Sequence, residues 1–83
     1  MTEHVITSPL PGVFYRSPAP GEPPFVQEGD SVEAGQTVGL VEIMKQFTEL
    51  KSGVAGVLEG FRVDDLAMVN PGDTVAVVRE GES

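Results

Sequence analysis

A weak internal repeat divides this chain into two similar halves and restricts its fold accordingly. Matching residues first lie 44 positions apart: Ser8 and Ser52, Gly12 and Gly56, Val13 and Val57. Farther along they lie 37 positions apart: Val26 and Val63, Val32 and Val69, Gly35 and Gly72, Thr37 and Thr74, Val38 and Val75, Val41 and Val78. With 83 residues the chain is one domain, and neither half could bury its apolar face alone. The two halves should therefore pack as one quasi-two-fold structure.

Short Val-rich runs between Gly and Pro residues predict that this structure is built from strands. Helical periodicity is nearly absent, and many short strands with frequent turn residues are typical of a β-sandwich or barrel. The pattern also allows a short helical patch at Asp64–Met68. The expected strands are Val5–Thr7, Gly12–Tyr15, Ser31–Val32, Thr37–Ile43, Gln46–Lys51, Val54–Arg62 and Thr74–Arg79.

The first half contains an insert that the second half lacks. The offset falls by seven between Val13 and Val26, so about seven extra residues lie within Tyr15–Pro24. Four of the seven residues from Pro18 to Pro24 are proline, which fixes φ and removes hydrogen-bond donors. The insert should be a stiff, protruding loop. It is either a plain connection or a contact for a ligand or partner.

Composition excludes most kinds of catalytic and binding site. The chain has no Cys and one His, so disulfides, thiolate clusters and multi-His zinc sites are excluded. His4 lies in a terminal segment expected to fray, which leaves no credible base for nucleophilic catalysis. Asp64-Asp65 is expected to be solvated. The net charge of −8 disfavours nucleic acid and anionic membranes, and no signal peptide or apolar span is present, so a cytoplasmic domain is expected.

The lysines are the residues most suggestive of chemistry. There are two, Lys45 and Lys51, and Met44-Lys45 lies between two well-matched strands. Two central residues make a tight hairpin tip that displays the lysine to solvent, where its amine is accessible for covalent attachment. Alternatively, the lysine serves solubility only. Met44 is unusual, because an exposed apolar tip residue favours a partner surface and departs from the Asn-Gly pair typical of such turns.

These residues also resemble a known family. Glu42-Ile43-Met44-Lys45-Gln46-Phe47 resembles the Glu-Ala-Met-Lys-Met motif of biotin carboxyl carrier proteins, and Gly35-Gln36-Thr37 and Lys51-Ser52-Gly53 resemble its flanks. The start of the chain, from Ser8-Pro9 to Gly12 and then through Phe14–Pro20, is similar to the carrier domain of acetyl-CoA carboxylase. The resemblance extends from about Val5 to Val78. The insert falls where that family has a thumb that folds over biotin.

The resemblance implies an all-β biotinyl domain, a flattened barrel-sandwich of two quasi-two-fold-related four-stranded sheets. It would span residues 1–83, with a core at about 5–79 and the thumb at about 16–24. Biotin protein ligase would attach biotin to Lys45, within a motif that includes Glu42 and Met44, and Ser17 in the thumb would contact the ring. The non-catalytic carrier would then move a carboxyl group from a biotin carboxylase to a carboxyltransferase, with acetyl-CoA as the acceptor in fatty acid synthesis.

The sequence departs from the family pattern at two positions beside the lysine. Ile43 replaces the usual Ala and Gln46 the usual Met, which puts the efficiency of biotinylation in question. One alternative is therefore a biotinyl-like binding or scaffold module that is never modified. A lipoyl-type carrier is a second alternative, although its motif has Asp where this chain has Met44. The chain begins almost at the domain, as a minimal carrier or a domain cut from a longer protein would.

Overall fold

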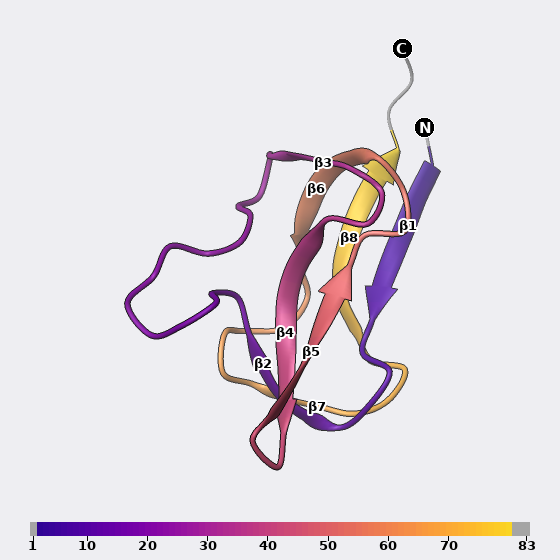
Figure 1. Cartoon of the computed structure of the whole chain (residues 1–83). Coiled ribbons are helices and arrows are strands. Elements are labelled where there is room, and N and C mark those ends of the chain that lie inside the picture. Colours follow the sequence, from indigo (N-terminus) through magenta and orange to yellow (C-terminus); the bar gives the residue numbers. More distant parts are fainter. Residues whose placement is uncertain (1, 81–83) are drawn as a thin grey trace.

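Eight strands form two four-stranded antiparallel sheets in the computed structural model, which describes residues 2–80 (Figure 1). One sheet has the order β1-β8-β6-β3 and the other β5-β4-β2-β7. No helix in this part of the chain is long and apolar enough to cross a membrane. The predicted all-β fold is confirmed. The strands are β1 (Thr2–Thr7), β2 (Gly12–Tyr15), β3 (Ser31–Val32), β4 (Thr37–Ile43), β5 (Gln46–Lys51), β6 (Gly56–Phe61), β7 (Met68–Val69) and β8 (Thr74–Glu80).

The sequence repeat reappears as a repeat of whole strands. An offset of 44 relates β1 to β5 and the start of β2 to that of β6, and an offset of 37 relates β3 to β7 and β4 to β8. Related strands also alternate alike between buried and exposed residues, since β1 matches β5 and β4 matches β8 position by position. Each sheet thus takes its strands from both halves of the chain, as the quasi-two-fold prediction required.

Two buried serines illustrate how closely the halves correspond. Ser8 donates a hydrogen bond from its hydroxyl to the carbonyl of Leu10 at 2.6 Å, and Ser52 donates to the carbonyl of Val54 at 2.5 Å. Both hydroxyl side chains are almost fully buried. A buried hydroxyl without a partner would cost about 1–3 kcal/mol, so each turn satisfies its serine locally.

Several predicted boundaries differ from the structure. β1 begins at Thr2 rather than Val5, because it pairs with β8 along its full length, from Thr2↔Glu80 onward. His4 is therefore held in a sheet, with its Nε2 2.8 Å from the Glu80 carboxylate, and the expectation that it frays was wrong. The carboxyl-terminal strand is one residue longer than predicted, and β6 is shorter than Val54–Arg62 at both ends.

The short helical patch that the sequence allowed at Asp64–Met68 does not form. Leu66 has a φ of 71°, in the left-handed region, which a right-handed helix cannot accommodate. Backbone hydrogen bonds instead join this segment to β2: Leu66 donates to Phe14 and Phe14 donates to Ala67, at 2.7 and 2.8 Å. The strand β7 follows directly, pairing Met68 with Val13.

The core lies between the two sheets and is made of small aliphatic side chains around one aromatic ring. Phe14 is fully buried there and packs against Phe61, with ring centroids 5.8 Å apart. Burial of apolar surface of this kind supplies most of the folding free energy. The buried residues of the cluster are Ile6, Phe14, Val26, Val32, Val38, Val41, Leu50, Leu58, Val69, Val75, Ala76 and Val78.

The fold separates the β4–β5 hairpin from the ends of the chain. In Figure 1, β1 begins and β8 ends at one end of the molecule, whereas the β4–β5 hairpin turns at the opposite end. The segment between β2 and β3, which contains the insert, projects from the side of the sandwich. The hairpin and the insert are thus the two features that extend from an otherwise regular pair of sheets.

Candidate functional site

The tip of the β4–β5 hairpin is a two-residue turn with strained backbone. Ile43 and Gln46 form the last pair of the ladder, which leaves Met44 and Lys45 as the central residues. Their φ angles are 54° and 65°, so both lie in the left-handed region that a type I′ turn requires. Asn and Gly meet that requirement at lower cost, which indicates that Met44 and Lys45 are not present for the sake of the turn.

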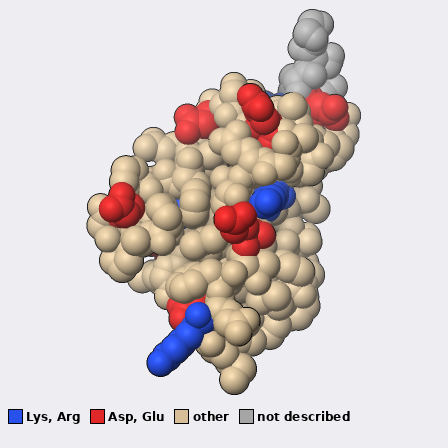
Figure 2. Space-filling view, in the orientation of Figure 1, with Lys and Arg blue, Asp and Glu red and all other residues tan. Residues whose placement is uncertain are grey.

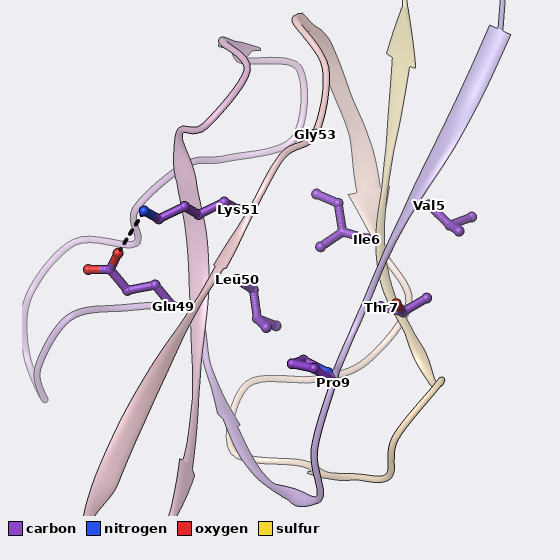
Figure 3. A pocket seen from close by; sticks show the side chains of 8 residues that line it. All are labelled: Val5, Ile6, Thr7, Pro9, Glu49, Leu50, Lys51 and Gly53. Atoms are coloured by element: carbon purple, nitrogen blue, oxygen red, sulfur yellow. Dashed lines mark ion pairs between the residues drawn. The ribbon is translucent and has the colours of Figure 1, made fainter.

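The two lysines differ sharply in their surroundings. Lys45 is exposed and forms no ion pair with another residue between 2 and 80, and Met44 beside it is 88% exposed. Lys51, near the far end of the same hairpin, lies 3.5 Å from the Glu49 carboxylate (Figure 3). The prediction of a lysine displayed on the hairpin tip is therefore confirmed for Lys45.

Glu42 is fixed in place by a tyrosine that sequence reasoning did not single out. The Tyr15 hydroxyl donates a hydrogen bond to the Glu42 carboxylate at 2.7 Å. This hydrogen bond, burial and the negative charge of Glu42 together raise the pKa of Tyr15 above its ordinary value of 10.0. The Tyr15 ring also meets Phe47 edge to face, with centroids 5.9 Å apart. These contacts tie the tip of the hairpin to β2.

The insert is anchored at its base. The amide of Phe25 donates to the carbonyl of Arg16 at 2.9 Å, which closes the loop at about the predicted thumb limits. The Arg16 guanidinium lies 4.2 Å from the centre of the Phe61 ring, a cation–π contact, and its amide donates to Asp65 at 2.9 Å. The base of the loop is thus joined both to the core and to the segment before β7.

A cavity of about 170 Å³ lies beneath this loop. Engineered protein cavities of about 150 Å³ hold a benzene ring, so a small ring system fits here. Tyr15 pairs with Leu40, four residues before Met44, or about 13 Å along the strand. The end of a lysine lengthened by an acyl chain can span that distance. The cavity is lined by Tyr15, Ser17, Ala19, Pro20, Gly21, Asp65 and Leu66.

A larger cavity of about 350 Å³ lies in the seam between the edge strands β1 and β5 (Figure 3). Its lining consists of quasi-symmetric pairs at the offset of 44, and the buried Ile6 and Leu50 form one of them. It contains none of the residues predicted from sequence as the site. The quasi-two-fold packing of two sheets with unpaired edges accounts for it.

The structure brings most of the predicted site residues together. Glu42, Met44 and Lys45 share the hairpin, and Ser17 lines the cavity under the insert, connected to the hairpin through Tyr15. Sequence reasoning missed Tyr15, Phe47 and the segment containing Leu66. The position of Tyr15 directly before the insert was an available signal for the first, whereas the left-handed turn at Leu66 had none. Within residues 2–80, no group of three or more His, Asp or Glu could hold a metal ion.

Comparison with known proteins gives a consistent result. Residues 4–78 match the model of a family described as biotin-requiring enzyme. The chain is 47% identical over 60 residues to the biotin carboxyl carrier protein of acetyl-CoA carboxylase 1, chloroplastic, of Arabidopsis thaliana, over 72% of this chain and 21% of that protein. It is 37% identical over 65 residues to the biotin carboxyl carrier protein of acetyl-CoA carboxylase of Haemophilus influenzae, over 78% of this chain and 42% of that protein.

A solved structure resembles the fold over nearly its whole length. The urea carboxylase of Kluyveromyces lactis matches with a TM-score of 0.80 and 28% identity, over 95% of this chain and 6% of that one. The plant proteins that match the chain are much longer than it is, since the matched segment is 21% to 28% of their length. The similarity thus concerns one domain of larger proteins.

Proposed function

Because the chain belongs to the family described as biotin-requiring enzyme, we propose that it is a biotin carrier domain of a carboxylase, with biotin attached to Lys45. The exposed hairpin tip is the observation that carries this proposal. Lys45 is exposed there and forms no ion pair with another residue between 2 and 80, and the left-handed turn holds it away from the sheets. The left-handed φ angles of Met44 and Lys45 cost conformational free energy, so the stability of the fold does not explain why these two residues form the tip.

The residues around the tip suit an acyl-linked ring. The cavity under the insert offers the Ser17 hydroxyl and the Asp65 carboxylate as polar groups, with Tyr15, Pro20 and Leu66 as apolar walls. A pocket with few polar groups among apolar walls is typical of sites for small ring-shaped ligands. Biotin supplies a ureido nitrogen that carries a carboxyl group. Ser17 remains our candidate for contact with the ring, as the sequence predicted.

The role of this chain is to position that group and to carry it between enzymes. We expect biotin protein ligase to load it, a biotin carboxylase to supply the carboxyl group and a carboxyltransferase to remove it. A covalent tether raises the effective concentration of the carried group at both enzymes without any catalysis by the carrier. Acetyl-CoA is the proposed acceptor, because the similar proteins named above are carriers of acetyl-CoA carboxylase.

The extent of the domain and its compartment complete the proposal. We expect one biotinyl domain with a core at about residues 5–79 and a thumb at about 16–24. Residue 1 and residues 81–83 of the predicted domain lie outside the described part of the chain. A cytoplasmic location stays a prediction, and some similar proteins are named as chloroplastic. Ile43 and Gln46 keep an unmodified binding module as the second candidate, because they flank the turn where a ligase must act.

Transfer of labelled carboxyl groups tests the carrier role. The purified chain would be loaded with biotin, then incubated with biotin carboxylase, ATP and labelled bicarbonate. We expect acid-labile label on the chain, which acetyl-CoA removes when carboxyltransferase is added. Lys45→Arg, which offers no acylatable amine, should take up no label, whereas Lys51→Arg should behave as the wild type. A loaded wild-type chain that takes up no label would contradict the proposal.

A further inference from the structure

The quasi-two-fold symmetry allows the surface beside Lys45 to be compared with the equivalent surface of the other sheet. Four residues lie opposite one another across the outer face of the sheet β5-β4-β2-β7: Phe47, Glu42, Val13 and Met68. The offsets of 44 and 37 map them onto four residues that lie opposite one another in the other sheet: Glu3, Arg79, Val57 and Ser31. Both sets occupy the same place in the same architecture.

The two sets differ where they are most exposed. Phe47 is 55% exposed and Met68 is 75% exposed, and their counterparts are the exposed Glu3 and Ser31. Because the fold accepts a charged and a small polar residue at these positions in one sheet, folding does not require Phe and Met in the other. Exposed apolar groups that folding does not need indicate an interaction surface.

The polar contacts of the two faces differ in the same way. In the other sheet, Arg79 donates to the Glu59 carboxylate at 2.7 Å, an ion pair that lowers the pKa of Glu59. At the corresponding positions beside Lys45, the Tyr15 hydroxyl donates to Glu42, also at 2.7 Å. Tyr15 thus occupies the position of Glu59 and Glu42 that of Arg79, so a hydrogen bond from a phenol replaces an ion pair. The Tyr15 ring packs against Phe47. We call Phe47, Tyr15, Val13 and Met68 the apolar row.

Charges around the apolar row indicate the chemistry of its partner. Glu42 lies within the row. Glu49 lies opposite Leu40, which in turn lies opposite Tyr15, and Asp65 lines the same cavity as Tyr15. Lys45 lies two residues from Phe47, at the hairpin end of the row, and acylation removes its charge. The chain as a whole carries a net charge of −8, and acidic groups outnumber basic ones on the face drawn in Figure 2. A matching partner therefore has an apolar cleft bordered by basic side chains.

We propose that the apolar row is the docking surface for the ligase that acylates Lys45, an inference that rests on the proposed carrier function. Before acylation, only the protein surface can distinguish Lys45 from Lys51. Phe47 lies two residues from Lys45 and begins the row, whereas Lys51 is paired with Glu49 and borders the seam cavity. The row extends this recognition from the hairpin across the sheet to Met68 on β7.

Substitution by the counterpart residues tests the proposal with little risk to the fold. Phe47→Glu and Met68→Ser introduce residues that the other sheet already carries at these places. The matched control is Val5→Glu, because Val5 is also exposed, at 59%, lies on the quasi-symmetric edge strand β1 and has Glu49 as its counterpart. Each variant would be checked by circular dichroism and thermal unfolding. Biotinylation by biotin protein ligase would be followed as kcat/KM for the carrier.

We expect Phe47→Glu to lower kcat/KM about tenfold, as loss of a central interface side chain does, and Met68→Ser to lower it severalfold. Val5→Glu should stay within about twofold of the wild type, since surface changes away from an interface have small effects. Values within about twofold for both folded row variants would overturn the docking surface while leaving the carrier function intact.

A direct binding measurement distinguishes failure of the docking surface from failure of the carrier function. Calorimetric titration of the Lys45→Arg chain into the ligase measures docking without acylation. If the chain binds the ligase and Phe47→Glu weakens this binding, the apolar row is supported, even if the wild-type chain is never acylated. In that case only the carrier function fails. A wild-type chain that is neither acylated nor bound would overturn both. Binding that Val5→Glu and Phe47→Glu weaken equally would show a nonspecific charge effect and contradict the row.

Discussion

At the level of single residues, Met44 destabilises the turn that displays Lys45. Its φ of 54° lies in a region that costs a non-glycine residue about 1–2 kcal/mol, and its side chain is 88% exposed. Neither feature helps the fold. The sequence already indicated this cost, because an apolar residue stood where a tight turn favours Asn. The left-handed Leu66 could not be foreseen in the same way, since no turn motif marks it.

Met44→Asn should therefore stabilise the fold. Asn tolerates the left-handed region, so we expect the free energy of unfolding to rise by about 1 kcal/mol. Urea unfolding followed by circular dichroism would measure it. Met68→Asn makes the same chemical change at an exposed position on β7 whose φ is ordinary, and it should not stabilise. Equal effects of the two substitutions would show that the turn carries no strain.

The hydrogen bond from Tyr15 to Glu42 predicts how the free energy of unfolding depends on pH. Its pKa is raised in the folded state, first by the hydrogen bond to Glu42, so folding favours the protonated phenol. The stability that this provides is complete below pH 10, the unfolded pKa, and is lost as the pH rises through the higher folded pKa. Tyr15→Phe has no ionisable group there, so its stability should depend less on pH above 10.

Absorbance measures this titration without interference, because the chain has one Tyr and no Trp. The phenolate signal near 295 nm should have its midpoint above pH 10 in the folded chain. The same chain in denaturant should titrate at about the ordinary value of 10. A folded midpoint at or below that of the denatured chain would show that the Tyr15–Glu42 hydrogen bond does not persist in solution.

At the scale of elements, the strands were predictable where alternation or Gly punctuation marked them. β2, β3, β4 and β5 have the expected bounds, and the structure relates them to β6, β7, β8 and β1 by the same offsets that the matching residues showed. The failures were local. β7 has only two residues and, unlike β3, which follows Gly29-Asp30, it has no turn motif before it. β1 reaches Thr2 only because β8 provides a partner for it. Tertiary pairing, not local propensity, decides such short or terminal segments.

Gly12 and Gly56 reveal how closely the strands approach one another. These quasi-symmetric glycines lie against the carbonyl groups of Glu42 and Arg79, and a Cβ on either would meet that oxygen. Gly56→Ala should therefore lower the free energy of unfolding by about 1–3 kcal/mol, and Gly12→Ala by a similar amount, because overpacking forces the backbone apart.

Gly53→Ala is the matched control for these two substitutions. A Cβ at Gly53 would have no atom within 4 Å, so we expect a change of less than about 0.5 kcal/mol. Chemical denaturation of the three variants compares them directly. If Gly56→Ala were as stable as Gly53→Ala, the close approach of β6 and β8 would be incorrect.

At the scale of the whole molecule, the two sheets share one architecture but differ on their outer faces. The halves share strands, buried serines and close-packed glycines, which explains why the repeat predicted a quasi-two-fold structure. The two four-stranded sheets followed only from the family resemblance. The first half differs from the second by the insert, and the sheet that carries Lys45 differs from the other sheet by the apolar row. Tyr15 contributes to both features, because it lines the cavity under the insert and packs against Phe47. The insert could be located from the shift in offset. The apolar row could not, since it exists only once strand pairing places Phe47 and Met68 on one face.

The mass of the chain after incubation with biotin protein ligase, biotin and ATP shows whether Lys45 is the attachment site for biotin. We expect intact-mass spectrometry to find one added biotinyl group and peptide mapping to assign it to Lys45. Lys45→Arg should gain no mass and keep the far-ultraviolet circular dichroism of the wild type, because the Lys45 side chain is exposed and forms no ion pair with another residue between 2 and 80. A wild-type chain that stays unmodified, or that carries biotin on Lys51, would contradict the account.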